Sequence, residues 1–308
     1  MYKDFNSIVL AAQKMPRKRV MAVAGAADAH VIDAVVHAAE MGIVTPVLVG
    51  DSAAIIDLLS QRAITPGTYR IVHCGKDDNP AEAAVALLRQ GEADFLMKGM
   101  IDTRVLLQEV VRKENGLHTG RVMSHFALNQ LPQFPKLIVN TDGGMIPYPS
   151  LEQKRQIIVN AVQTLRKLGN ACPKVAILAA VEKVNPKMVE TTDAYTLQEM
   201  NHNGEIPDCT VVGPISYDLA MDAEMAAIKK YNCADCGDFD ILVAPNMAAG
   251  NILEKSWYIT AGAKMAGIIV GAKIPIVLTS RGSSAEEKFL SIVLASMTAG
   301  EEDTSCSR

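Results

Sequence analysis

The sequence has few aromatic residues and no excess of basic charge. Aromatic side chains make up 5% of its 308 residues, and 30 lysines and arginines stand against 34 aspartates and glutamates, which gives a formal net charge of −4. Domains that bind nucleic acid usually carry a basic excess that displaces phosphate counterions. We therefore expect no nucleic-acid partner.

Long apolar runs are also absent. The best candidate, near the C-terminal end, is interrupted by Lys264 and Lys273 and falls short of the ~20 residues that a membrane helix needs. The apolar run at residues 8–12 is short, and a basic cluster at 17–19 follows it, which is the reverse of a secretory signal. We expect a soluble, cytoplasmic protein without a membrane partner, and the length predicts about two domains.

The six cysteines are scattered, and the common catalytic motifs are missing. Cys233 and Cys236 have the spacing of half a zinc site, but no second half lies nearby, so we expect neither a metal nor a disulfide framework. The sequence has no G-x-G-x-x-G, P-loop, H-E-x-x-H or G-x-S-x-G motif. His118 and His125 fall in a stretch interpreted as irregular, where we expect hydrogen-bonded structural roles.

Short β-branched runs alternate with amphipathic segments of helical length along the whole chain. This alternation predicts an α/β protein with mainly parallel sheets, and several strands have the continuous apolar cores of strands buried on both faces. The predicted strands are Val20–Ala24, Pro46–Val49, Arg70–His73, Asp94–Met97, Lys136–Val139, Lys174–Ala179, Cys209–Val212, Asp240–Val243 and Pro275–Thr279.

Capping signals mark the starts of several helices. Ser150 with Gln153 has the form of a capping box. Asn79-Pro80 and Asn185-Pro186 each place a proline directly after an N-cap residue. Helices are therefore expected to begin at these three points.

Two stretches are candidates for a domain boundary. Prolines interrupt regular structure in Leu131–Pro135, and the chain is expected to return near 261–273. The predicted domains are residues 1–136 plus 272–308, and residues 137–271. A cleft between two such α/β domains is the usual place for a ligand.

The segment from Ile274 to Glu287 is the most informative for chemistry. A buried strand leads into a polar turn, and a helix is predicted to begin near Ser284. The carboxyl edge of a parallel strand beside a helix N-terminus is the usual ligand position in α/β proteins. Arg281 adds a guanidinium that matches phosphate oxygens, so the segment indicates a site for phosphate or a phosphoryl ester.

Helix capping is the alternative explanation of the same segment. Ser283 with Glu286 and Ser284 with Glu287 both have capping-box spacing, so the carboxylates could serve only the helix. Because only one pair can cap, one glutamate remains for another role.

Two further polar turns follow predicted strands. In Pro245–Asn251, small residues allow a ligand to approach the backbone, or Asn251 is simply the N-cap of an ordinary helix. In Met97–Asp102, Lys98 could meet a phosphate or remain solvated.

Five ordered motifs resemble the phosphate acetyl/butyryltransferase family, most closely its butyryl branch. They are Met97–Thr103, Ala180–Pro186, Gly213-Pro214, Ala249–Asn251 and Leu278–Arg281, and together they cover about residues 90–300. The resemblance implies two α/β domains with an interdomain cleft, as in isocitrate and isopropylmalate dehydrogenases. This agrees with the alternation of strands and helices.

The resemblance also implies an activity in short-chain fatty acid metabolism. A butyryl or similar acyl group would move between CoA and inorganic phosphate, with CoA as a substrate, no cofactor, and a homo-oligomeric enzyme. By the family pattern, Ser280 would contact the reacting centre and Arg281 would hold the phosphate. The residues expected to bind substrates are Lys98, Gly99, Thr103, Asp142, Gly213, Asn246, Gly250 and Asn251.

A carboxylate near the start of the last helix would be the base on the CoA thiol. The acetyl branch has an aspartate at the position of Glu287, whereas Glu286 matches a glutamate of both branches. With Ser283 as N-cap, Glu286 would close the capping box and Glu287 would be the base. The alternatives are a phosphate acetyltransferase, a nicotinamide-dependent dehydrogenase on the same fold, and a non-catalytic acyl-CoA-binding protein.

Overall fold

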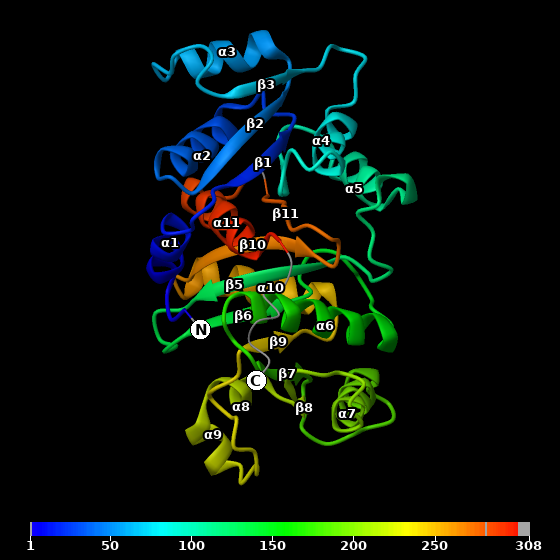
Figure 1. Ribbon diagram of the computed structural model, residues 1–308. Helices are drawn as coiled ribbons and strands as arrows, with labels where there is room; N and C mark the ends of the chain where they lie inside the picture. Colours follow the sequence, from blue (N-terminus) through cyan, green and yellow to red (C-terminus); the bar gives the residue numbers. More distant parts are fainter. Residues whose placement is uncertain (1, 281, 301–308) are drawn as a thin grey trace. The chain divides into compact units, whose positions relative to one another are not determined.

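The computed structural model describes residues 2–280 and 282–300, and the chain forms two compact units (Figure 1). Unit 1 contains residues 2–4 and Val122–Met265, and unit 2 contains Phe5–Arg121 and residues 266–300. Both predicted boundaries, at 136/137 and at 271/272, therefore fall inside a unit. In the described part of the chain, no helix is long and apolar enough to cross a membrane.

Unit 2 is built on a largely parallel sheet with helices on both sides. Its strand order is β3 (Arg70–His73), β2 (Val44–Gly50), β1 (Arg19–Ala24), β4 (Phe95–Lys98), β11 (Ile276–Val277) and β10 (Lys264–Val270), of which residues 266–270 belong to this unit. All neighbours are parallel except β10 and β11. Helices α1 (Phe5–Gln13), α2 (Ala29–Glu40) and α11 (Ala285–Thr298) lie on one side, and α4 (Pro80–Arg89) and α5 (Thr103–Val111) on the other (Figure 1).

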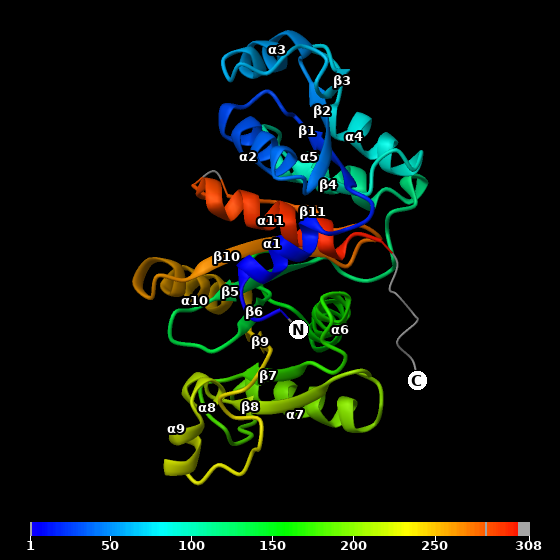
Figure 2. The same ribbon diagram turned by 60° about the vertical axis from the view of Figure 1, so that its left-hand side comes forward.

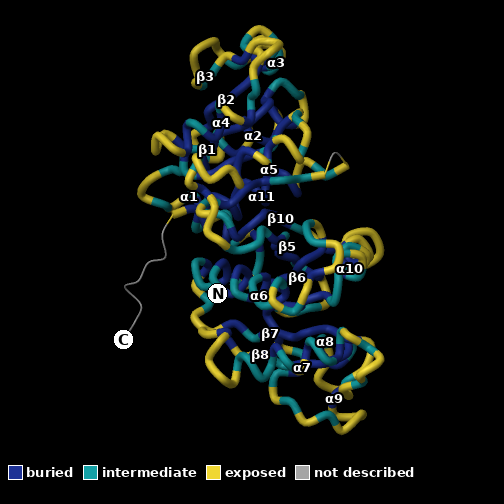
Figure 3. Tube along the Cα trace, turned by 90° about the vertical axis from the view of Figure 1, so that its right-hand side faces the viewer, coloured by how far each residue is buried: buried dark blue, intermediate teal, exposed yellow. Residues whose placement is uncertain are grey.

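The inner strands of unit 2 are largely buried because helices cover the sheet, and much of their length is dark blue in Figure 3, whereas the edge strand β3 is exposed or intermediate. In β1, residues 21–24 have no exposed surface, which is expected of a parallel strand between two helical layers. Asp28, Asp51, Asn79 and Asp102 cap α2, α3 (Ser52–Ser60), α4 and α5, and each side chain accepts a backbone N–H of its helix. The loops that leave the strands therefore end on short polar side chains.

Unit 1 has a smaller sheet of the same kind. Its strand order is β5 (Ser124–Gln130), β6 (Leu137–Thr141), β9 (Ile241–Val243), β7 (Lys174–Leu178) and β8 (Thr210–Ile215), and only β5 with β6 is antiparallel. Its helices are α6 (Leu151–Lys167), α7 (Val189–His202), α8 (Tyr217–Met221), α9 (Ala223–Ile228) and α10 (Met247–Thr260). Helices α6 and α10 lie on opposite sides of β6 (Figure 2). Trp257 of α10 packs in the core beside Phe239 and Leu242.

The predicted α/β class with mainly parallel sheets is confirmed. All nine predicted strands are present, Arg70–His73 with the predicted bounds and the other eight with one or both ends shifted. Strands β5 and β10 were not predicted. His125 lies in β5, so its assignment to irregular structure is wrong. The pairing of β5 with β6 ties residues 124–130 to unit 1, and the pairing of β10 with β11 ties residues 268–269 to unit 2. These two pairings explain why the domain boundaries differ from the prediction.

Two of the three predicted helix starts are confirmed. Ser150 and Gln153 form a reciprocal capping box, and Asn79-Pro80 opens α4. The start at Asn185-Pro186 is wrong, because α7 begins at Val189. The Asn185 side chain accepts the N–H of Lys187 at 3.0 Å, so it closes a turn ahead of the helix instead of capping it.

Candidate functional site

Three neighbouring parallel strands of unit 2 end at one edge of its sheet. Ala24 of β1 is in register with Lys98 of β4, and Met97 of β4 with Val277 of β11. The loops after these strands therefore leave the sheet side by side. A Cβ at Gly99 would lie 2.1 Å from the carbonyl oxygen of Gly25, so only glycine lets these two loops pass so closely.

Lys98 and Thr103 lie at this edge, as the prediction requires of substrate-binding residues. The Lys98 ammonium is half-buried and donates to the carbonyl of Gly99 at 3.2 Å. Thr103 is the first residue of α5, which Asp102 caps by accepting the N–H of Arg104 at 2.7 Å. A cation and a helix N-terminus thus meet beside the end of β4, where an anion is favoured.

The polar turn after β11 is closed by Ser280 and Ser283. The Ser283 N–H donates to the Ser280 carbonyl at 3.1 Å, which is the bond of a β-turn. Arg281, the expected phosphate ligand, lies outside the described residues. Helix α11 begins at Ala285, and the Ser284 hydroxyl accepts the N–H of Glu287 at 3.1 Å.

Helix α11 therefore starts one residue later than the base assignment assumed. Ser284 is the N-cap, and Ser283 as N-cap is wrong. The Ser283 N–H closes the turn and the Ser283 hydroxyl donates to the Glu287 carboxylate, whereas the helix N–H of Glu287 is accepted by Ser284. Glu287, not Glu286, occupies the third helical position, where the partner in a capping box would lie.

The two adjacent glutamates have different surroundings. Glu286 is exposed, whereas Glu287 is 9% exposed. Oε1 of Glu287 accepts the hydroxyl proton of Ser283 at 2.5 Å, and Oε2 has no hydrogen bond to another described residue. A carboxylate held by one oxygen keeps the other for a proton or a ligand.

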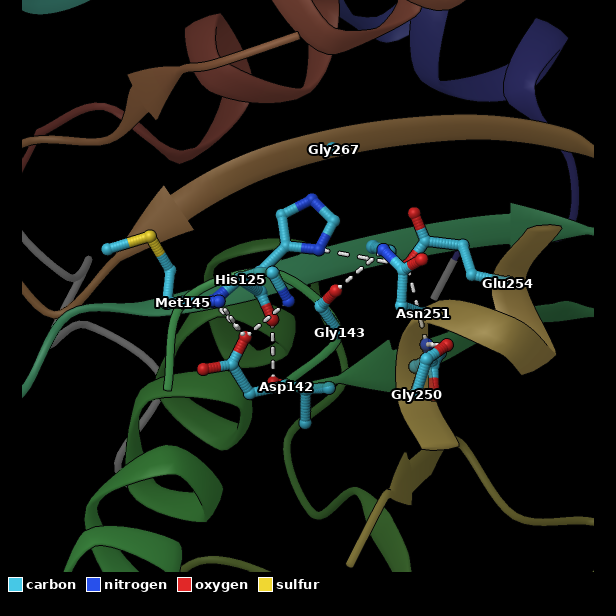
Figure 4. A network of polar contacts seen from close by, with 12 residues as sticks. His125, Asp142, Gly143, Met145, Gly250, Asn251, Glu254 and Gly267 are labelled. Carbon is cyan, nitrogen blue, oxygen red and sulfur yellow. Dashed lines mark hydrogen bonds and ion pairs between the residues drawn. The ribbon is translucent and has the colours of Figure 1, made fainter. Parts of the chain in front are cut away.

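In unit 1, Asp142 organises the loop between β6 and α6 (Figure 4). Its Oδ1 accepts the N–H groups of His125 at 3.2 Å, Gly144 at 2.9 Å and Met145 at 2.9 Å, and its Oδ2 accepts that of Ile146 at 2.9 Å. Asp142 is 3% exposed. Backbone amides use both of its oxygens, so its geometry supports a role in shaping the loop.

The start of α10 packs against the same loop. Asn246 is the N-cap and accepts the N–H of Ala249 at 3.0 Å, so the alternative that Asn251 is the N-cap is wrong. Asn251 lies inside α10 and donates to the Gly143 carbonyl at 3.0 Å (Figure 4). A Cβ at Gly250 would lie 2.9 Å from the Asp142 carbonyl oxygen, so close packing of the helix on the loop requires glycine there.

His125, which is partly buried, lies beside the buried Glu254, a proximity that the sequence did not reveal. His125 Nδ1 lies 3.7 Å from Glu254 Oε2, and this nitrogen is buried without a hydrogen-bond partner in the described residues. A Cβ at Gly143 would lie 3.1 Å from Glu254 Oε2, and one at Gly144 would lie 3.2 Å from the His125 ring. The pair adds to the crowding that favours glycine at these two positions, together with the backbone of Gly250, which lies 3.1 Å from a Cβ at Gly143.

Gly213 has a packing role that needs no ligand. It is buried in β8, and a Cβ there would lie 2.8 Å from the Ile177 Cβ and 3.1 Å from the Ala194 Cβ. Its N–H donates to the Gln198 side chain at 3.0 Å. These contacts account for glycine at this position.

Glu182 of the Ala180–Pro186 motif contacts Ser216, which follows the Gly213-Pro214 motif by two residues, just after the end of β8. The Ser216 hydroxyl lies 2.5 Å from a Glu182 carboxylate oxygen and 2.6 Å from one of Asp218, so these two carboxylates share its single proton, and Lys229 pairs with both. The Ser216 hydrogen bond lowers the pKa of Glu182. Hydrogen bonds from Lys229 and Ser216 lower the pKa of Asp218 to about 2. The carboxylates of Glu182 and Asp218 are thus paired with Lys229 inside the cluster.

The predicted site residues divide between the two units. Unit 2 contains Lys98, Gly99, Thr103, Ser280, Glu286 and Glu287, and unit 1 contains Asp142, Gly213, Asn246, Gly250 and Asn251. In the described residues of unit 1, the side chains of Asp142, Asn246 and Asn251 bond to the loop or to their own helix. In unit 2, Glu287 retains an unused oxygen.

The fold of this chain is similar to that of solved phosphotransacylases. The branched-chain phosphotransacylase from Enterococcus faecalis V583 superimposes with a TM-score of 0.81 at 34% identity, covering 91% of this chain and 98% of that chain. Phosphate butyryltransferase from Clostridium acetobutylicum is 38% identical over 302 residues, covering 98% of this chain and all of the relative. A probable phosphate butyryltransferase from Bacillus subtilis is 43% identical over 288 residues, covering 94% and 95%.

The family model described as phosphate acetyl/butaryl transferase matches residues 76–296. The chain belongs to this family, and the resemblance noted in its motifs is confirmed.

Proposed function

We propose that this chain transfers a short-chain acyl group, butyryl or similar, between CoA and inorganic phosphate in the cytoplasm. The structural observation that carries the proposal is the strand-end site of unit 2, where Glu287 is held by one oxygen beside the turn at Ser280, which Arg281 follows in the sequence. The family of the chain and the activities for which its relatives are named support the same reaction.

In the proposed reaction, the CoA sulfur attacks the carbonyl carbon of the acyl phosphate and the bond to phosphate oxygen breaks. Glu287 Oε2 accepts the thiol proton, because a thiol with a pKa of ~8.5 is largely protonated at neutral pH. Arg281 stabilises the charge that collects on the departing phosphate, and Ser280 donates a hydrogen bond to the reacting centre. The reverse direction uses the same groups, so CoA is a substrate and no cofactor takes part.

Direct transfer without an acyl-enzyme is part of the proposal, and the cysteines support it. Burial raises the pKa of Cys74, and raises those of Cys209 and Cys236 to about 12, so these thiols are poor nucleophiles. Cys172 lies two residues before β7, on the side of the unit 1 sheet opposite to the carboxyl end of that strand, and Cys233 lies in the loop between α9 and β9. Cys306 lies outside the described residues. Each cysteine is therefore expected to be replaceable without loss of turnover.

A thiol-consumption assay with acyl phosphate and CoA tests the proposal. Acetyl, propionyl, butyryl and branched acyl phosphates are compared, and the highest kcat/KM is expected for a four-carbon or similar chain. Arg281→Ala should lower kcat/KM by roughly 10²–10³, the usual effect of losing one preorganised charge-stabilising group. Absence of acyl transfer with every substrate leaves a non-catalytic acyl-CoA-binding protein, and reduction of a nicotinamide by a hydroxy acid identifies a dehydrogenase. An acetyl preference makes it a phosphate acetyltransferase.

A further inference from the structure

Lys288 is a buried lysine without a carboxylate partner in the described part of the chain. It is 7% exposed, and its ammonium has one acceptor there, the Ser283 carbonyl at 2.5 Å. Removing an ammonium from water without a counter-charge is costly. The position is also unfavourable for a cation, because it lies near the positive N-terminal end of α11.

A second buried lysine, Lys154 in unit 1, shows the usual solution. It is 4% exposed and its ammonium lies 2.8 Å from an Asp193 carboxylate oxygen. Lys154 is therefore neutralised by an ion pair, whereas Lys288 is committed to a backbone carbonyl. The difference indicates that the role of Lys288 is to hold the Ser283 carbonyl in place.

That residue, Ser283, is held from two sides. Lys288 binds its carbonyl, and its hydroxyl donates to Glu287 Oε1 at 2.5 Å. Its N–H also closes the turn with the Ser280 carbonyl. All three polar groups of Ser283 are therefore engaged, which fixes both its backbone and its side chain.

The helix beneath this contact is also anchored. The Ser291 hydroxyl donates to the Glu287 carbonyl at 2.7 Å and accepts the Gly267 N–H at 3.0 Å. Ser291 has no exposed surface. The first turn of α11 is therefore fixed to β10, and the orientation of the Glu287 carboxylate depends mainly on Ser283.

We propose that Ser283 and Lys288 are positioning residues for Glu287: Lys288 fixes the Ser283 backbone, and the Ser283 hydroxyl fixes the carboxylate so that Oε2 faces the thiol. This inference rests on the proposed function, because it takes Glu287 as the base. It assigns no direct substrate contact to Ser283 or Lys288. We call the contact of Lys288, Ser283 and Glu287 the clasp.

A double-mutant cycle tests whether Ser283 acts through Glu287. Ser283→Ala should lower kcat by roughly 10- to 100-fold, because a small misplacement of a catalytic group has effects of this size, with KM for acyl phosphate changed less than threefold. In a Glu287→Gln background the same change should have little further effect, since residues that act as a unit are not additive. Ser283→Thr keeps the hydroxyl and should restore most of the activity. If the kcat losses of Ser283→Ala and Glu287→Gln instead multiply in the double variant, Ser283 does not act through Glu287 and the inference is overturned.

Lys288→Met removes the ammonium, and Lys154→Met is the matched control in the other unit. Lys288→Met should lower kcat by roughly tenfold, and Lys288→Arg should recover part of this loss. Lys154→Met should affect the melting temperature but not kcat at temperatures where the enzyme is folded. Equal kcat losses in the two methionine variants would show that Lys288 has only a general structural role.

Hydrogen exchange separates failure of the clasp from failure of the proposed function. In the intact protein, Ser283→Ala and Lys288→Met should speed amide exchange in residues 283–288, whereas Lys154→Met should not. This measurement needs no turnover, so it decides the clasp even if the wild-type enzyme transfers no acyl group. Unchanged exchange in Lys288→Met would disprove it.

Discussion

Two buried carboxylates, one in each unit, lie close to the ends of strands, and they are used differently. Asp142 of unit 1 is 3% exposed and accepts four backbone N–H groups with its two oxygens. Glu287 of unit 2 is 9% exposed and accepts one side-chain hydroxyl with one oxygen. A carboxylate saturated by backbone amides shapes a loop, whereas one with an unused oxygen can exchange a proton. Burial alone does not distinguish the two roles.

The largest expected effect is at Glu287. Glu287→Gln keeps the shape and the oxygen that accepts from Ser283 but removes the basicity, so kcat should fall by roughly 10²–10⁴. The melting temperature should change little. Steady-state kinetics and calorimetry on the same preparation check both statements.

Glu286→Gln is the adjacent comparison, and its effect on kcat should be much milder because Glu286 is exposed on the next face of the helix. A large rate loss at Glu286 with full activity in Glu287→Gln would transfer the base role to Glu286. The geometric distinction between the two glutamates would then have no catalytic meaning.

Asp142→Asn tests the other half of the comparison. An amide keeps one acceptor oxygen and points an NH₂ group at backbone N–H donors, so the free energy of unfolding should fall by about 2–4 kcal/mol. Asp57, an exposed residue bonded to Gln61, gives the control Asp57→Asn, which should cost less than about 0.5 kcal/mol. Denaturant unfolding measures both. Full stability with lost activity in Asp142→Asn would mean that Asp142 contacts substrate, as the family resemblance implied.

Gly213→Ala tests whether a glycine of unit 1 serves packing or contacts substrate. The added Cβ would lie 2.8 Å from the Ile177 Cβ, and overpacking of this kind costs roughly 1–3 kcal/mol. KM for CoA and acyl phosphate should remain within about twofold of wild type, since both neighbours are core residues. A raised KM with an unchanged melting temperature would instead make Gly213 a substrate contact.

The elements that the sequence predicted are those whose signals are local. Apolar runs mark the parallel strands, and Ser150 with Gln153 marks a helix start, because in each case neighbouring residues produce the signal. Strand β5 was missed because Ser124, His125 and Asn129 interrupt its apolar run. In the folded chain the Ser124 hydroxyl accepts a hydrogen bond from the Asn160 side chain, and the Asn129 amide donates to the Ala127 carbonyl.

The candidate site was predicted unevenly for the same reason. Its place after β11 follows from the order of strand, polar turn and helix. The identity of the N-cap depends on which serine hydroxyl lies against a backbone N–H of the first helical turn, and in the folded chain this is Ser284, which accepts the N–H of Glu287. The pairing of His125 with Glu254 joins β5 to α10, and no local pattern reports such a distant contact.

The smallest expected effect concerns a third kind of carboxylate, at the surface of unit 1. Hydrogen bonds from Lys229 and Ser216 lower the pKa of Asp218 to about 2, below the ~3.9 of an unfolded aspartate. A lowered folded-state pKa adds stability above pH ~4, and this contribution is lost as the pH falls from ~4 through about 2. Because the Asp218 side chain is 44% exposed, solvent screening keeps the effect small. Asp218→Asn should lower the melting temperature at pH 7 by less than about 2 °C, and the difference from wild type should shrink between pH 4 and pH 2 and in 0.5 M salt. A difference that stays constant across this pH range would show that the Asp218 charge contributes nothing to folding, and that only its hydrogen bond to Ser216 does.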